Sequence, residues 1–152
     1  ACSDLPTCQG QWWPEGMDFQ HGFDITQHVG PNYLGGQLTS DGRVAFHVSH
    51  RLGAVLVLGY LAILLVMLWR QRAQSGLDRA IALAGGALVI QFCLGLTNVW
   101  LHIPLIVAVA HNAMGAGLLL SMVHLIWRHH QLALPALSPA PHTTTINREV
   151  TA

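Results

Sequence analysis

The stretch AIALAGGALVIQFCLGLTNVWLHIPLIVAVAHNAMGAGLLLSMVHLIW, residues 80–127, contains no Asp, Glu, Lys or Arg. A helix needs about 20 apolar residues to cross a bilayer, so this stretch is long enough for two crossings. Pro104 lies near its middle, and proline suits the first turn of a helix. The sequence therefore predicts two membrane-spanning helices, at about 80–101 and 105–127, separated by a short turn.

A further apolar stretch, residues 45–69, carries no full charge after Arg51 and predicts another span before these two. Charged residues make up 9% of the 152-residue chain, and hydrophobic residues make up 52%. Typical soluble domains are about 25% charged. The predicted fold class is therefore all-α, a polytopic membrane bundle with three transmembrane helices. Its net charge is zero and it has no basic cluster, which argues against a nucleic-acid partner.

The arginines indicate the orientation. Arg70, Arg72 and Arg79 lie between the first two predicted spans, and Arg128 follows the third. By the positive-inside rule these ends are cytoplasmic, and the acidic segment before the first span is extracytoplasmic. Such a segment needs an upstream helix to translocate it, and no signal peptide is visible. We therefore expect the chain to be part of a larger protein, in a bacterial inner membrane or alternatively a mitochondrial one.

Two terminal segments flank the spans. Residues 1–44 mix turn residues with aromatic residues and predict an extracytoplasmic lid with a short amphipathic helix. Cys2 and Cys8 lie six positions apart on the oxidising side, so they are candidates for a disulfide, with two free thiols as the alternative. Residues 128–152 end in a Pro-, Ala- and Thr-rich sequence and predict a disordered cytoplasmic tail.

Two histidines lie at similar depth in parallel predicted spans. His50 is about five residues into the first span and His111 about six into the third, both counted from the outer end. At helical rise this places them within about 9 Å of that end. Two such imidazoles can hold one metal-centred cofactor, and a haem with two axial histidines is the most economical choice. The alternative is that each makes an interhelical hydrogen bond without any ligand.

Small residues accompany both histidines. Gly53 follows His50 by three positions and Gly115 follows His111 by four, so each lies on its histidine's face of the helix. The absence of a side chain at a glycine leaves space for a flat macrocycle to approach the helix. Alternatively, the glycines serve only helix packing.

Three polar neighbours complete the candidate site. Arg51 lies at the outer mouth, where it is suited to pair with a haem propionate. His47 lies one turn outward of His50 and is either a supporting hydrogen-bond donor or a rival ligand. Asn112 either steadies the neighbouring histidine or bonds to another helix. The remaining histidines receive no assigned role, His21, His28 and His124 among them.

The sequence resembles the C-terminal half of heme A synthase. The similar stretches are LPTCQGQWWPEGMDF (5–19), FHVSHRLGA (46–54) and LGLTNVWLHIPLIVAVAHNAMGAGLLL (94–120). A helix start of the form HxxHR, followed about sixty residues later by PLIVAVAHNA, is a specific combination. The resemblance covers the chain from Cys2 to about Trp127.

This resemblance implies a protein of two related four-helix halves, each with a histidine on its second and fourth helices. The three spans correspond to the last three helices of the second half, which holds haem b and its iron. By the same correspondence His50 and His111 are the axial ligands, and Cys2 and Cys8 form an outer-loop disulfide. Haem O, the substrate, and haem A, the product, belong to the missing half.

One departure indicates which half this is. The catalytic half has a glutamate three residues before its first histidine, whereas this chain has His47 there and no Asp or Glu within its three predicted spans. We therefore expect no catalytic residue in this chain. We expect it to be the haem b half, which relays electrons while the methyl group of haem O is oxidised to the formyl group of haem A. The alternatives are a stand-alone bis-histidine membrane cytochrome b and a purely structural anchor. Expected partners are the missing N-terminal catalytic half, the lipid bilayer, haem O synthase and an electron acceptor such as a quinone.

Overall fold

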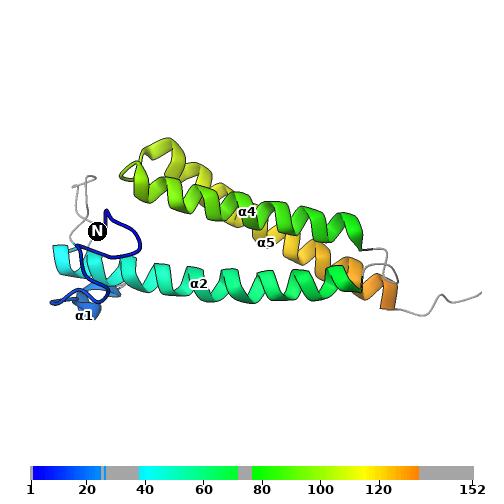
Figure 1. Cartoon of the computed structure of the whole chain (residues 1–152), viewed down its shortest axis with the longest axis horizontal. Helices are drawn as coiled ribbons and strands as arrows, with labels where there is room; N and C mark the ends of the chain where they lie inside the picture. Colours follow the sequence, from blue (N-terminus) through cyan, green and yellow to red (C-terminus); the bar gives the residue numbers. More distant parts are fainter. Residues whose placement is uncertain (1, 25, 27–37, 72–76, 134–152) are drawn as a thin grey trace, which may run out of the picture.

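The structure is a computed structural model that describes residues 2–24, 26, 38–71 and 77–133 (Figure 1). These residues form helices and connecting loops without a β-strand. The helices are α1 (Phe19–Gly22), α2 (Ser40–Arg70), α4 (Asp78–Trp100) and α5 (Leu105–Ala133). Three of them are long and apolar enough to cross a membrane, namely Ser40–Arg70, Asp78–Trp100 and Leu105–Leu132. The all-α fold with three candidate spans is therefore confirmed.

Two helix ends differ from the prediction. Helix α2 begins at Ser40, before the predicted 45, because the Thr39 hydroxyl caps it by accepting a hydrogen bond from the Gly42 amide at 3.1 Å. Helix α5 continues to Ala133, so the first residues of the predicted tail are helical. The rest of that tail lies outside the described residues.

Helices α2 and α5 run in the same direction, and α4 runs opposite to both (Figure 1). Helix α4 packs along α5 and also contacts α2. A core joins the C-terminal half of α2 to the start of α4 and the later part of α5. Its buried members are Leu65, Leu77, Ala80, Ile81, Ala84, Leu88 and Leu125. This core fixes the three helices at one end and leaves the histidine-bearing ends to form the site.

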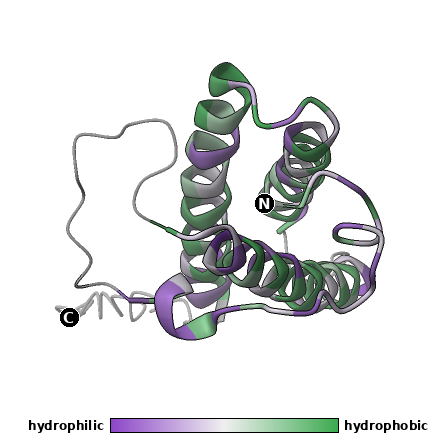
Figure 2. Ribbon diagram, turned by 90° about the vertical axis from the view of Figure 1, so that its left-hand side faces the viewer, coloured by the Kyte–Doolittle hydropathy of each residue, from purple (hydrophilic) through white to green (hydrophobic). Residues whose placement is uncertain are grey.

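Most of the length of the long helices is hydrophobic in sequence, as the hydropathy colouring of the ribbon in Figure 2 shows. Large side chains such as Leu56, Ile106 and Leu120 are 73%, 83% and 69% exposed. A helix that is apolar on nearly every side suits hydrocarbon rather than water. The fold is therefore that of an integral membrane protein.

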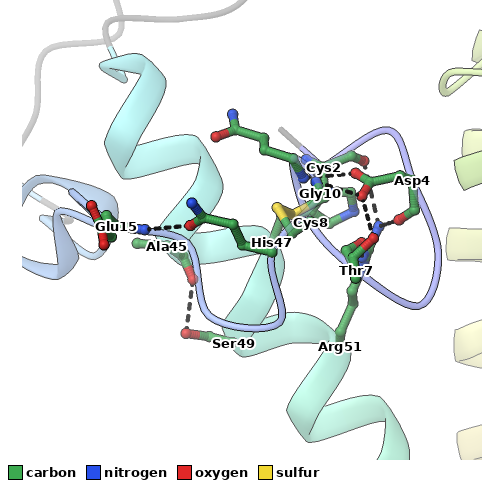
Figure 3. The surroundings of a disulfide bond; sticks show 12 residues. Cys2, Asp4, Thr7, Cys8, Gly10, Glu15, Ala45, His47, Ser49 and Arg51 are labelled. Atoms are coloured by element: carbon green, nitrogen blue, oxygen red, sulfur yellow. Dashed lines mark hydrogen bonds between the residues drawn. A yellow bond between two sulfur atoms is a disulfide. The ribbon is translucent and has the colours of Figure 1, made fainter.

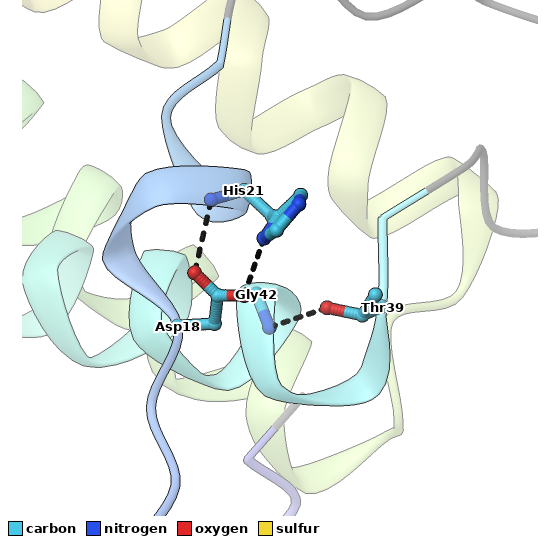
Figure 4. A network of polar contacts seen from close by, with 4 residues as sticks. All are labelled: Asp18, His21, Thr39 and Gly42. Atoms are coloured by element: carbon cyan, nitrogen blue, oxygen red, sulfur yellow. Dashed lines mark hydrogen bonds and ion pairs between the residues drawn. The ribbon is translucent and has the colours of Figure 1, made fainter.

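The short helix α1 is fastened to the first turn of α2 (Figure 4). Asp18 caps α1 by accepting a hydrogen bond from the His21 amide at 3.0 Å, and its carboxylate also contacts the His21 ring. Gly22 lies so close to α2 that a Cβ there would come within 2.9 Å of the Gly42 carbonyl oxygen. This contact requires glycine, and it holds the N-terminal segment against the start of the first span.

Candidate functional site

A cavity of about 890 Å³ lies between α2 and α4, beside the start of α5 and below the N-terminal loop. Its volume is within the usual range for sites that bind small molecules or cofactors, about 300–1,000 Å³. Most of the lining is apolar, and a few polar side chains converge on it. These are His47, His50, Arg51, Gln91, Asn98 and His111.

The two histidines predicted to meet do lie together. The ring centroids of His50 and His111 are 6.3 Å apart, with the ring planes at 76° to each other. The two helices that carry them, α2 and α5, run in the same direction (Figure 1). His50 is exposed and His111 is half-buried, and both line the cavity. Their role as ligands stays a prediction.

Helix α4 packs closely around the His111 ring. The Gln91 amide nitrogen lies 3.4 Å from His111 Nε2, which is the range of a weak hydrogen bond. Gly95 lies against the same ring, and a Cβ there would come within 3.2 Å of His111 Cε1. The ring is therefore placed by an amide and by the missing side chain of a glycine.

Four side-chain atoms buried in the described part of the chain have no hydrogen-bond partner. They are Arg51 Nε, Gln91 Oε1, Asn98 Oδ1 and His111 Nδ1. All four belong to residues that line the same cavity. Because an unsatisfied polar atom is costly in a medium of low dielectric constant, their gathering indicates a site for a ligand with polar or metal-binding groups.

The kind of metal centre that fits is limited by the donor set. The described residues contain no group of three or more His, Cys, Asp or Glu side chains that could hold a bare ion. Two facing imidazoles supply two ligands, so a metal that brings its own remaining ligands, as haem iron does, fits this donor set.

Arg51 has a role that the sequence did not predict (Figure 3). Its guanidinium donates hydrogen bonds to the carbonyl oxygens of Thr7 at 2.8 Å, Asp4 at 2.9 Å and Cys2 at 3.5 Å. These bonds hold the N-terminal loop over the cavity. Pairing with a haem propionate stays a prediction, and Nε is the guanidinium nitrogen that these contacts do not use.

The other predicted site residues take different positions. His47 lines the cavity, and its Nδ1 accepts a hydrogen bond from the Cys2 amide at 3.0 Å. Gly53 also lines it, and a Cβ there would meet nothing within 4 Å. A Cβ on Gly115 would lie 3.4 Å from the Gln91 side chain. Asn112 is exposed and is not among the lining residues, so the structure does not bring it to the site.

Cys2 and Cys8 lie side by side in the loop, with their Cα atoms 4.7 Å apart, a separation suited to a disulfide (Figure 3). Both are buried against Val44 and Val48 of α2. The loop therefore packs on the helix through its cysteines, close to the Arg51 contacts.

Sequence reasoning missed the contribution of α4. Gln91, Gly95 and Asn98 are spaced by four and then three residues, which puts them on one helix face toward the cavity. Of the three, Gln91 contacts His111 directly. This spacing is the feature of the sequence that could have indicated a shared site. Of the unassigned histidines, His21 pairs with Asp18, the His124 ring lies 5.9 Å from that of Trp127, and His28 lies outside the described residues.

Fold and site together define a membrane-spanning helical bundle with a histidine-lined cavity. The family of cytochrome oxidase assembly proteins (COX15-CtaA) matches residues 1–123. A heme A synthase from Shewanella oneidensis is 34% identical over 123 residues, which are 81% of this chain and 36% of that protein. No solved structure matches the chain. The chain therefore belongs to the cytochrome oxidase assembly protein family, and it spans about a third of the length of this relative.

The carboxylate of Asp4 gives the loop a pH dependence. Hydrogen bonds from the Thr7 hydroxyl and the Gly10 amide lower the pKa of Asp4 from 3.8 to about 2. The folded loop thus favours the charged carboxylate of Asp4. This carboxylate therefore stabilises the folded loop fully above its ordinary pKa, and the stabilisation is lost as the pH falls through about 2. An NMR titration of the Gln9 and Gly10 amides, which also bond to Asp4, should show a midpoint near 2. A midpoint near 3.8 would contradict the network.

Replacing Gly95 by alanine should destabilise the bundle. The added Cβ would lie 3.2 Å from His111 Cε1, so the ring or the helix must move. Overpacking of this kind costs about 1–3 kcal/mol, measurable as a lower free energy of unfolding. Gly86→Ala is the matched control on the same helix, because its Cβ would meet nothing within 4 Å. Equal stability of the two variants would show that the close approach is not needed.

Proposed function

We propose that this chain is the haem b half of a heme A synthase and that His50 and His111 are the axial ligands of the haem iron. The observation that carries the proposal is the 6.3 Å separation of the two ring centroids across the cavity. Metal–nitrogen bonds of about 2 Å and a ring radius of about 1 Å place two imidazoles on opposite sides of one metal about 6 Å apart. Family membership supports heme A biosynthesis and favours this half over a stand-alone cytochrome b.

Each residue at the cavity has a distinct part in this proposal. His50 and His111 each offer a ring nitrogen, and Gly53 leaves open space beside His50. When bound, the haem supplies one-electron transfer. Arg51 and His47 hold the N-terminal loop in place, and that loop brings Leu5, Pro6 and Trp12 to the cavity wall. The chain therefore binds, orients and covers the cofactor.

The same geometry supports an electron-transfer role rather than catalysis. The acidic residues of the described spanning helices are Asp41 and Asp78, each in the first turn of its helix. Neither lines the cavity, so no carboxylate is in place there to move protons. We propose that haem O is oxidised to haem A in an N-terminal half of the protein. This chain then relays the electrons from that half to an acceptor such as a quinone. Haem O synthase is the proposed source of the substrate.

We further propose that the loop faces the outside of a bacterial inner membrane and that the end of α5 faces the cytoplasm. The arginine-rich connection before α4 and Arg128 on α5 support this orientation through the positive-inside rule. On that side the compartment is oxidising, and the adjacent Cys2 and Cys8 are proposed to form a disulfide.

Replacing either histidine should remove the haem b signal. In the full-length membrane protein, His50→Ala and His111→Ala should each abolish the low-spin b-type band in a reduced-minus-oxidised visible spectrum, because one axial ligand is lost. Conversion of haem O to haem A should fall with it.

His124→Ala is the matched control for that experiment. His124 lies on α5, as His111 does, but its ring contacts Trp127 and it is not part of the cavity lining. Its spectrum should equal that of the wild type. A b-type band that survives both cavity substitutions would refute the proposed ligands.

The cysteine pair can be tested without any cofactor. Thiol labelling of the denatured, unreduced protein should modify Cys93 alone, and labelling after reduction should modify all three cysteines. Cys2→Ser should expose Cys8 to the reagent and raise the protease sensitivity of the loop. Labelling of all three cysteines before reduction would rule out the disulfide.

A further inference from the structure

A strained turn joins helices α4 and α5. The backbone φ angles of His102 and Ile103 are 57° and 61°, so both residues are in the left-handed conformation. Glycine adopts this conformation freely, whereas a β-branched residue such as isoleucine is a clear outlier in it. Pro104 follows, and a residue before proline ordinarily adopts an extended conformation. The turn therefore opposes two backbone preferences of Ile103.

Hydrogen bonds to the end of α4 hold this turn. The His102 amide donates to the Val99 carbonyl oxygen at 3.3 Å, and the Ile103 amide donates to the Asn98 carbonyl oxygen at 2.7 Å. This pair of bonds is a common C-terminal cap, in which the residue after the cap position is left-handed. The cap position is Leu101, so the motif accounts for His102. It does not account for the left-handed conformation of Ile103.

The Ile103 side chain lies at the boundary between two cavities. It lines the 890 Å³ cavity and also a smaller one of about 210 Å³. Among the described residues, only His47 of α2 shares both linings; the smaller cavity is also lined by Leu38, Arg43 and Phe46. The α4–α5 turn lies at the same end of the bundle as the start of α2 (Figure 1). Ile103 and His47 therefore form a partition at the end of the large cavity that the N-terminal loop covers.

We infer that the strained turn places the Ile103 side chain as the wall that closes this end of the haem cavity. Backbone strain persists where the surrounding structure fixes it, and it is concentrated at ligand sites. Ile103 is 51% exposed, so packing against protein does not explain its position. His50 lies one helical turn from His47, which puts the partition beside a proposed axial ligand. The inference rests on the proposed function for the identity of the ligand, but the closure itself does not depend on haem.

The first test compares Ile103→Gly with His102→Gly in the full-length protein. Both variants replace a left-handed residue by glycine, but only Ile103 lines the cavities. We expect haem to transfer to an excess of apomyoglobin about tenfold faster from Ile103→Gly, because an apolar contact is lost. Transfer from His102→Gly should match that of the wild type. Equal transfer rates in the two variants would overturn the inference.

Two checks separate closure from general stability. Ile103→Gly should not unfold at a lower denaturant concentration than the wild type, because relief of strain offsets the loss of a half-exposed side chain. Ile103→Leu keeps the apolar volume and should return haem transfer to within a few-fold of the wild type. Fast haem loss that comes with easier unfolding, or that leucine does not correct, would show that Ile103 is not the closing wall.

A measurement without haem keeps this inference separate from the proposed ligands. Gly53 lines the large cavity and has open space for a Cβ, so Gly53→Cys introduces a thiol there. In the haem-depleted full-length protein, a charged methanethiosulfonate added from water should modify this thiol several-fold faster when Ile103→Gly is also present. The combination with His102→Gly should react at the unchanged rate.

The two kinds of failure are then distinguishable. If the b-type band survives both His50→Ala and His111→Ala, the proposed ligands are wrong, and faster thiol modification with Ile103→Gly still supports the closure. Equal modification rates in the two glycine combinations overturn the closure, even when both axial histidines are confirmed.

Discussion

The organisation of this protein depends on the inability of hydrocarbon to form hydrogen bonds. A polar side chain in a spanning helix must find a partner inside the bundle, or it costs free energy. Several polar residues of the three long helices gather at one cavity, where His47 bonds to the loop, Gln91 contacts His111, and Arg51 holds loop carbonyls. Within the described ranges, the buried side-chain atoms without a hydrogen-bond partner belong to residues on the wall of the same cavity. The constraint that shapes the bundle therefore also marks its site.

The bundle divides into a part with a packed apolar core and a part with a polar-lined cavity. Leucine and alanine side chains of α2, α4 and α5 pack tightly around Leu65, Ala84 and Leu125. At the other end the helices carry histidines, an arginine and glycines, and the N-terminal loop fills the opening between them. The apolar core fixes how the helices lie against each other. In that arrangement the ring centroids of His50 and His111 are 6.3 Å apart. Rigid support of this kind is what a site with two ligands from separate helices needs.

The N-terminal loop belongs to the site as well as to the surface. It is fastened by the cysteines against Val44 and Val48, by hydrogen bonds to His47 and Arg51, and by α1 through the close approach of Gly22 to Gly42. Each fastening uses α2, the helix that carries His50.

The sequence by itself determined the number and type of the spans, because a long run without charge has no other stable place than a bilayer. It also determined that His50 and His111 lie at similar depth, since helical rise converts residue count into distance. Only the tertiary structure decided the partners: Arg51 bonds to the loop, Asn112 stays outside the cavity, and Gln91 and Gly95 of α4 surround His111. Helical periodicity gives the face of each residue but not the rotation of one helix against another. That rotation is set by the packing of α4 on α5, and it brought Gln91 and Gly95 against the His111 ring.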